Sequence, residues 1–226
     1  METVVVSIGG SVLAPGDPDA AFVKRMAAEL AALSKVVKLF VVTGGGKTAR
    51  AYIEAGRALG APEPFLDRLG IKVTRLNARL LLGALGGVDA DEMPHTIGEA
   101  VTVGKGASLV VMGGTTPGHT TDAVAAELAE AVAAHRVVNA TSVDGVFTAD
   151  PAKDATAKRL DRASYEDLIR LSGEAHTKAG PSIVFDPKAA RIVARARIPL
   201  AVVNGRDLEA LRNAVLGKPF RGTLVG

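Results

Sequence analysis

The chain has 226 residues, of which 48% are hydrophobic and 4% aromatic, and this suffices for one large α/β domain. It contains no cysteine, which excludes a disulfide framework, a thiolate metal site and a cysteine nucleophile, and is compatible with the cytoplasmic location that we expect. The net charge of +3 comes from scattered Lys and Arg residues, and no apolar run reaches membrane-spanning length. Neither nucleic acid nor a membrane is therefore an expected partner.

The first part of the chain alternates apolar strands with amphipathic helices. β-Branched runs bounded by glycine predict buried strands, and apolar residues at helical spacing predict helices. In chain order these are a strand at Thr3–Ile8, a helix at about Ala20–Ser34, a strand at Val36–Thr43, a helix from Lys47 to about Leu59 and a long helix at Phe65–Leu85.

The same alternation continues after a glycine-rich segment, Gly86–Gly106, which is expected to be irregular with a possible short strand or helix. The further predictions are strands at Ser108–Met112, Arg136–Thr141 and Pro199–Val203, helices at Thr121–Ala134, Tyr165–Ser172, Lys188–Arg197 and Leu208–Leu216, a turn at Asp144-Gly145 and an edge strand at Gly222–Val225. Strands alternating with helices predict a three-layer αβα fold with a mostly parallel central sheet.

Glycines follow each of the first three predicted core strands, as Gly9-Gly10, Gly44–Gly46 and Gly113-Gly114. In open α/β sheets ligands bind beyond the carboxyl ends of the strands, so three such turns indicate a site at one sheet edge. The longest turn, Gly113–Asp122, adds threonine hydroxyls and ends at a helix start, which is typical of a phosphate cradle. Neither a Walker A motif nor a strand-linked GxGxxG is present.

Several charged residues flank these turns. Lys47 and Arg50 open a helix, where cations are electrostatically unfavourable unless an anion is bound, so we expect them to contact phosphate. Asp122 either favours its own helix start or orients basic groups or a metal around a transferring phosphoryl group. His119 is interpreted as a hydrogen-bond donor of the loop. Asp67 is either an ordinary helix residue or a ligand of ribose hydroxyls, and spacing alone leaves both open.

These motifs resemble the amino acid kinase superfamily, and more narrowly the uridylate kinases of the archaeal type. The resemblance runs almost end to end, and the combination of GGTTPGHTTD at Gly113–Asp122 with VDGVFTADP at Val143–Pro151 is highly specific. The other matching motifs are SIGGSVL at Ser7–Leu13, VTGGGKTAR at Val42–Arg50, FLDRLGIKVTRLNARLL at Phe65–Leu81 and the remainder of Thr141–Lys158.

The resemblance implies an enzyme that transfers the γ-phosphoryl group of ATP to UMP and yields UDP and ADP in pyrimidine nucleotide biosynthesis. Mg²⁺ is expected to arrive with ATP, held by phosphate oxygens and water rather than by protein carboxylates. The implied architecture is a single domain over residues 1–226, with an acceptor-binding part at roughly 1–135 and an ATP-binding part at roughly 136–226. The family assembles as a homohexamer, often through its long helix.

The resemblance also assigns roles to individual residues. ATP contacts are implied at Gly9, Gly10, Gly45, Arg50, Thr141, Ser142, Phe147 and Asp150. UMP contacts are implied at Gly44, Asp67, Thr115, Thr116, Pro117, Gly118, His119, Thr120 and Thr121. Asp122 matches the acid that organises the catalytic centre, and Lys47 and Arg50 complete the expected catalytic set.

Three positions depart from the family pattern. Ser7 stands where many superfamily members carry lysine, which shifts the charge stabilisation to Lys47, Arg50, the metal or the backbone. Ser142 and Phe147 stand where archaeal relatives tend to have asparagine and tyrosine. The alternatives are another kinase of the superfamily, such as one acting on isopentenyl phosphate, or a non-catalytic nucleotide or oxyanion store on the same fold.

Overall fold

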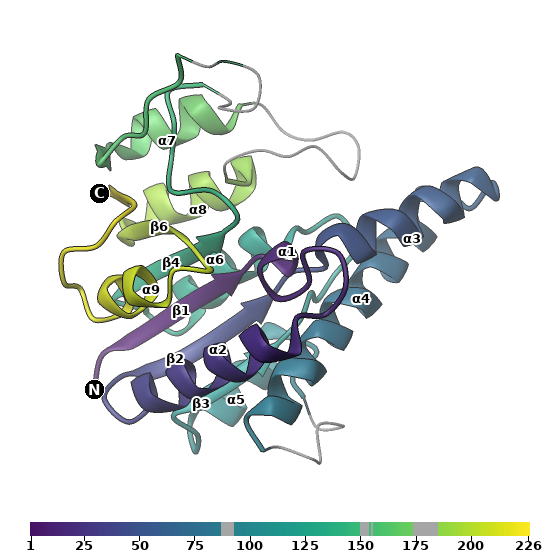
Figure 1. The fold of residues 1–226 in the computed structure, drawn as a ribbon, viewed down its shortest axis with the longest axis horizontal. Helices are drawn as coiled ribbons and strands as arrows, with labels where there is room; N and C mark the ends of the chain where they lie inside the picture. Colours follow the sequence, from purple (N-terminus) through teal and green to yellow (C-terminus); the bar gives the residue numbers. More distant parts are fainter. Residues whose placement is uncertain (87–92, 150–153, 155, 174–184) are drawn as a thin grey trace.

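A computed structural model describes residues 1–86, 93–149, 154, 156–173 and 185–226 of the chain. In this part a seven-stranded sheet runs in the order β3-β2-β1-β4-β6-β7-β5, and helices cover both of its faces (Figure 1). The strands are β1 (Thr3–Ile8), β2 (Lys38–Thr43), β3 (Leu109–Met112), β4 (Arg136–Thr141), β5 (Arg162–Ala163), β6 (Leu200–Asn204) and β7 (Thr223–Val225). The helices are α1 (Gly10–Leu13), α2 (Ala20–Leu33), α3 (Gly46–Ala58), α4 (Glu63–Ala84), α5 (Ile97–Gly104), α6 (Thr121–Ala131), α7 (Tyr165–Ser172), α8 (Pro187–Ala196) and α9 (Leu208–Val215).

The sheet is parallel except at one edge, where β6 and β7 pair antiparallel. β1 lies inside the sheet between β2 and β4, and its residue Ser7 is level with Val42 of β2 and Asn139 of β4. The predicted three-layer αβα fold with a mostly parallel sheet is therefore confirmed. Because β1, β2 and β3 are parallel neighbours, the glycine turns that follow them emerge at the same sheet edge.

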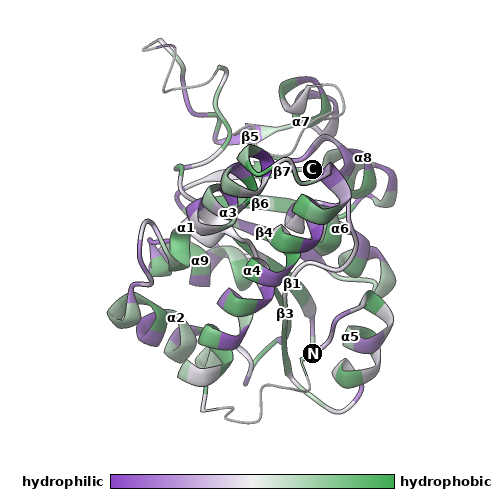
Figure 2. Cartoon of the chain, turned by 90° about the vertical axis from the view of Figure 1, so that its right-hand side faces the viewer, coloured by the Kyte–Doolittle hydropathy of each residue, from purple (hydrophilic) through white to green (hydrophobic). Residues whose placement is uncertain are grey.

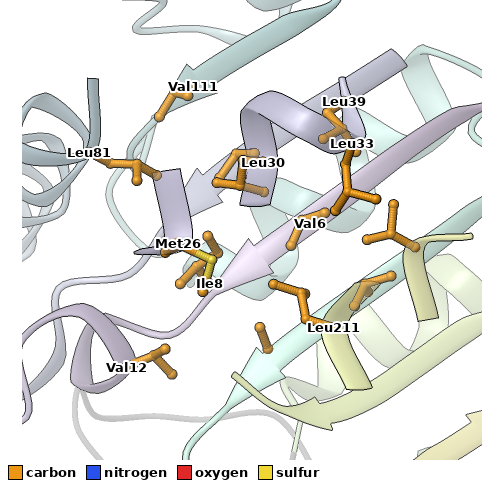
Figure 3. Packing of buried hydrophobic residues seen from close by; sticks show 14 of the residues in the cluster. Val6, Ile8, Val12, Met26, Leu30, Leu33, Leu39, Leu81, Val111 and Leu211 are labelled. Atoms are coloured by element: carbon orange, nitrogen blue, oxygen red, sulfur yellow. The ribbon is translucent and has the colours of Figure 1, made fainter. Parts of the chain in front are cut away.

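Alternating residues of β1 face two separate hydrophobic clusters, one on each side of the sheet. Val4, Val6 and Ile8 pack against α2, α4 and α9, as Figure 3 shows for part of this cluster, while Val5 faces the cluster that contains α6 and α8. These four side chains are fully buried. Because side chains alternate between the two covered faces of the sheet, β1 is apolar on both faces, with Ser7 as its one polar residue after Thr3.

Side-chain caps account for most of the helix starts. Asp19 accepts a hydrogen bond from Phe22 N at 3.0 Å, Thr120 from Ala123 N at 3.1 Å and Asp186 from Ala189 N at 2.9 Å. Each bond satisfies one of the backbone donors that a helix leaves unpaired in its first turn. The helix start predicted at Asp186-Pro187 is confirmed.

The segment expected to be irregular with a possible short strand or helix contains the helix α5. Thr96 caps its start by accepting from Glu99 N at 3.2 Å, in the Thr-x-x-Glu pattern of a capping box. Two other elements differ from expectation. The short helix α1 replaces a simple glycine turn after β1. The two-residue strand β5 was not predicted, because so short a segment carries no periodic signal.

α4 is the longest helix of the described part, with 22 residues, and with α3 it extends past the sheet (Figure 1); Figure 2 shows both helices from the side on which they extend. It carries charged residues along its length, including Asp67, Lys72 and Arg75. Across the described ranges, no helix combines the length and the apolar character that crossing a bilayer requires.

Candidate active site

The glycine turns that follow β1 and β2 lie against each other, main chain to main chain. A Cβ atom on Gly10 would lie 2.2 Å from Gly46 N and 2.4 Å from Gly45 C, and one on Gly44 would lie 2.7 Å from Gly10 N. Gly46 also has a φ of +64°, which residues with a side chain rarely adopt. The contact between the turns therefore already requires glycine at these positions, independently of any ligand.

Two polar side chains of α4 hold the turns in place. Asn77 Nδ2 donates to Gly44 O at 2.7 Å, and Thr74 Oγ1 accepts from Gly114 N at 2.7 Å. Both residues are buried. Buried polar residues on the sheet-facing side of a helix are the signal that would have identified them, because such groups need hydrogen-bond partners.

The N-terminus of α3 has no side-chain cap. Its N-cap residue is Gly45, which has no side chain. Among the described helices of eight or more residues, only α4, whose N-cap is Pro62, also lacks a side-chain cap. The first N–H groups of a helix, together with its dipole, form an anion-binding end when no side chain occupies them. The glycine triplet thus leads into a helix start that suits a phosphate.

The two cations in the first half of α3, Lys47 and Arg50, point in different directions. Arg50 reaches towards the first glycine turn, with NH2 3.5 Å from Ser11 Oγ. Lys47 is exposed and lines a mostly apolar pocket of about 600 Å³ together with Pro18, Leu76 and Asn77. No ion pair of Lys47 occurs within the described residues. The structure therefore brings Arg50 to the glycine turns and leaves Lys47 beside them.

The loop Gly113–Thr121, which we call the acceptor loop, is fastened to α4 at two points. Arg75 Nε donates to Gly114 O at 3.1 Å, and Asp67 Oδ2 accepts from Gly118 N at 2.9 Å. The structure thus places Asp67 directly against the loop predicted to bind the same ligand. Of the loop residues predicted to bind UMP, Thr116, Pro117, Gly118 and Thr120 are exposed, and Thr115, His119 and Thr121 are half-buried.

Asp122 occupies the first turn of α6, directly after the acceptor loop, and faces β1. Its Oδ1 accepts a hydrogen bond from Ser7 Oγ at 2.9 Å. Burial raises the pKa of Asp122 from 3.8 to about 6, the Ser7 hydrogen bond opposes this rise, and the nearby charge of Asp186 adds to it. Among the described residues no Lys or Arg pairs with this carboxylate. Asp122 is thus a partly buried anion without a protein counter-charge in this part of the chain.

The other residues predicted to bind ATP lie at the end of β4, the strand beside β1, and in the segment after it. Gly9 N donates to Ala140 O at 2.9 Å, so the first glycine turn abuts the end of β4, where Thr141 lies. Ser142 is exposed in the turn that follows, and Phe147 is half-buried and forms a bridge with Arg159. Asp150 lies outside the described residues.

Asp144 has a structural role that was not predicted. Its Oδ1 accepts from Asn204 Nδ2 at 2.9 Å, and its Oδ2 pairs with Arg221 NH2 at 2.7 Å. The Asn204 hydrogen bond, followed by the charge of Arg221, lowers the pKa of Asp144. These contacts fix the turn after β4 to the end of β6 and to the segment before β7.

A metal-binding cluster is not evident in the described ranges, because nowhere do three His, Cys, Asp or Glu side chains come together in them. Asp122 lies close enough to Asp186 for their charges to interact, and one or two carboxylates are what a Mg²⁺ ion bound through substrate phosphates uses. The donor set therefore fits a divalent cation that arrives bound to a nucleotide.

Comparison with known proteins adds to this geometry. The sequence profile of the family described as "Amino acid kinase family" matches residues 2–204. The uridylate kinase of Methanocorpusculum labreanum is 47% identical, covering 100% of this chain and 96% of that protein, and that of Pyrococcus abyssi is 43% identical, covering 98% of each. The crystal structure of uridylate kinase from Archaeoglobus fulgidus superposes with a TM-score of 0.87 at 40% identity, covering 100% of both chains.

Proposed function

The chain belongs to the amino acid kinase family, and on this premise we propose that it is a uridylate kinase, which transfers the γ-phosphoryl group of ATP to UMP and yields UDP and ADP. The observation that carries the proposal is the meeting of two glycine turns, an uncapped helix N-terminus and the carboxylate of Asp122 at one sheet edge. Such a site can hold two phosphate groups close together.

For this reaction the protein must position the two phosphate groups and neutralise their charge. The phosphate of UMP is already an anion, so no general base is needed, and the transition state spreads charge over the oxygens of the transferred group. The backbone donors of the turns and of the α3 N-terminus orient the phosphates, and Arg50 adds positive charge. Lys47 acts as a second cation once its flexible side chain turns towards the phosphates.

Asp122 orients the cations of the substrate complex. Its raised pKa reflects a buried carboxylate whose counter-charge is not supplied by the described residues. A Mg²⁺ ion bound with ATP would supply that charge, and a cation close to Asp122 would lower its pKa and keep it as a carboxylate. Ser7, at the position where many superfamily members carry lysine, donates a hydrogen bond to Asp122 instead of a charge to the substrate.

Acceptor and donor occupy different parts of the chain. Residues at roughly 1–135 hold UMP, with Gly44 and the acceptor loop around the nucleotide and Asp67 at the ribose. Asp67 uses Oδ2 for Gly118 N, and among the described residues Oδ1 accepts no hydrogen bond, which fits a ribose hydroxyl there. Residues at roughly 136–226 hold ATP, through Thr141, Ser142, Phe147 and Asp150 together with Gly9, Gly10 and Gly45.

The enzyme forms a homohexamer, with α3 and α4 contributing to its contacts. Large apolar side chains are exposed on these two helices and in the turn between them: Tyr52 is 56% exposed, Leu59 88%, Phe65 48% and Leu76 62%. Such clustering on neighbouring elements is typical of a protein–protein interface. Light scattering after size exclusion tests the assembly. Because ATP and UMP are cytoplasmic metabolites, the enzyme acts in the cytoplasm, in pyrimidine nucleotide synthesis.

A coupled ADP-release assay with MgATP tests the activity. The acceptors are UMP, CMP, dUMP and isopentenyl phosphate, and UMP is expected to give the highest kcat/KM. A preference for isopentenyl phosphate would assign the chain to a different kinase of the family. Tight nucleotide binding without turnover of any acceptor would identify a nucleotide store and contradict the proposal.

A further inference from the structure

A cluster of three polar side chains joins the acceptor loop to α6 and α8. Lys188 Nζ, in the first turn of α8, lies 2.8 Å from His119 Nε2 of the loop and 2.6 Å from Glu127 Oε1 of α6. Glu127 Oε2 lies 3.4 Å from His119 Nδ1. The two carboxylate oxygens thus face Lys188 and His119, while Lys188 contacts both partners.

The contact with Lys188 selects one form of the imidazole. An ammonium group can only donate hydrogen bonds, so His119 Nε2 accepts and carries no proton. The proton of the neutral ring is then on Nδ1, which faces the carboxylate of Glu127. Nδ1 is buried and has no aligned hydrogen-bond partner in the described part of the chain, so Glu127 complements the N–H dipole by its charge alone.

A second ion pair between the same two helices shows what this cluster adds. Arg195 NH2 lies 2.9 Å from both carboxylate oxygens of Glu130, towards the other end of α8, and within the described ranges it forms no hydrogen bond or ion pair with the loop. α6 and α8 therefore have another ion pair besides that of Lys188 with Glu127. Lys188 and Glu127 differ from the pair of Arg195 and Glu130 because they also hold His119.

His119 directly follows Gly118, which α4 holds from the other side through Asp67. Gly118 has a φ of +79°, so the chain at this point is a turn that glycine makes adaptable. Adjacent residues of the acceptor loop are thus bound to α4, in the expected acceptor part, and to α8, in the expected ATP part. Without the contact of His119 with α8, the end of the loop is held by the cap of α6 and by the hydrogen bond from Gly118 to Asp67.

We propose that Lys188 and Glu127 are positioning residues, which hold His119 as the Nδ1–H tautomer and thereby fix the acceptor loop for UMP. The inference rests on the proposed function, since the loop is the expected UMP site. Lys188 touches neither reacting phosphate by this account. Its loss should weaken UMP binding and leave ATP binding unchanged.

The test compares Lys188→Met with the matched control Arg195→Met, which removes the same charge from the same helix pair. Lys188→Met is expected to raise KM for UMP about fivefold, the effect of losing one partly exposed ion pair, with KM for ATP unchanged. Glu127→Gln should shift KM for UMP in the same direction, and Arg195→Met should leave it at the wild-type value. Far-UV circular dichroism checks that each variant is folded.

Nitrogen-15 NMR of the His119 ring gives a readout that does not depend on activity, with the signal assigned by His119→Gln. The Nδ1–H tautomer in the wild type, and its loss in Lys188→Met, support the proposal. An Nε2–H tautomer in the wild type, or equal KM changes in Lys188→Met and Arg195→Met, would overturn it. A wild type that does not phosphorylate UMP would refute the proposed function instead, and the tautomer would still decide whether Lys188 holds His119.

Discussion

Replacing Asp122 with asparagine should make the folded protein more stable at neutral pH while it abolishes phosphoryl transfer. Burial raises the pKa of this carboxyl from 3.8 to about 6, and the charge of Asp186 contributes to the rise. A raised pKa means that the folded state binds the proton more tightly than the unfolded state. The stability that this proton provides is complete below about pH 4 and is lost as the pH rises through about 6.

The size of the effect follows from the shift in pKa. About two pKa units correspond to roughly 3 kcal/mol of destabilisation by the ionised carboxylate above about pH 6. Asparagine removes the charge and keeps one oxygen for the hydrogen bond from Ser7, but it loses the second acceptor oxygen, which costs about 1 kcal/mol. Asp122→Asn is therefore expected to gain about 1–2 kcal/mol at about pH 7.5 and to lose this advantage at about pH 4.

Urea unfolding at both pH values measures the free energy of unfolding, at one protein concentration so that assembly does not change the comparison. The control is Asp161→Asn, which removes the same charge from a side chain that is 83% exposed, and it should change stability little at either pH. In parallel, kcat of Asp122→Asn should fall at least about 100-fold. A variant that is no more stable than the wild type at neutral pH, or one that keeps its kcat, would refute the reasoning.

Three further substitutions test other parts of the site. Lys47→Ala should lower kcat much more than it raises KM for UMP, and an unchanged kcat with weaker UMP binding would show that Lys47 does not act on the transferred group. Asp67→Asn should weaken the charge-assisted hydrogen bond to the ribose and raise KM for UMP about tenfold. Steady-state kinetics should show KM for ATP unchanged. Equal changes in both Michaelis constants would argue against ribose binding by Asp67. Gly44→Ala should destabilise the fold by about 1–3 kcal/mol in thermal unfolding, because its Cβ would lie 2.7 Å from Gly10 N. Gly83→Ala, with nothing within 4 Å of its Cβ, should not destabilise the fold. Equal melting temperatures of the two variants would show that the contact between the turns does not require glycine at position 44.

The fold and the position of the site were largely predictable from local patterns. β-Branched apolar runs and glycine endings identify β1, β2 and β3, and parallel pairing then brings their glycine turns to the same edge. The position of Asp122 at a helix start also follows from its neighbours in sequence. What local pattern could not provide is that Asp122 faces Ser7, because those residues are 115 positions apart.

The contacts between distant segments account for the rest of the site. Asn77 and Thr74 look like ordinary helix residues until the fold places them beside the glycine turns. In the sequence, Lys188 is a cation at a helix N-terminus, where the helix dipole disfavours positive charge. Only the packing of α8 against α6 places Glu127 next to it. No sequence spacing predicts either of these sets of contacts, because each joins elements that become neighbours only in the folded chain.

The most direct test of the central claim follows the transferred group itself. The protein is incubated with MgATP labelled in the γ-phosphoryl group and with UMP, and the products are separated by anion-exchange chromatography. The account predicts that the label appears in the β-phosphoryl group of UDP, in step with ADP release. Label recovered as inorganic phosphate, or retained in ATP despite bound UMP, would contradict it.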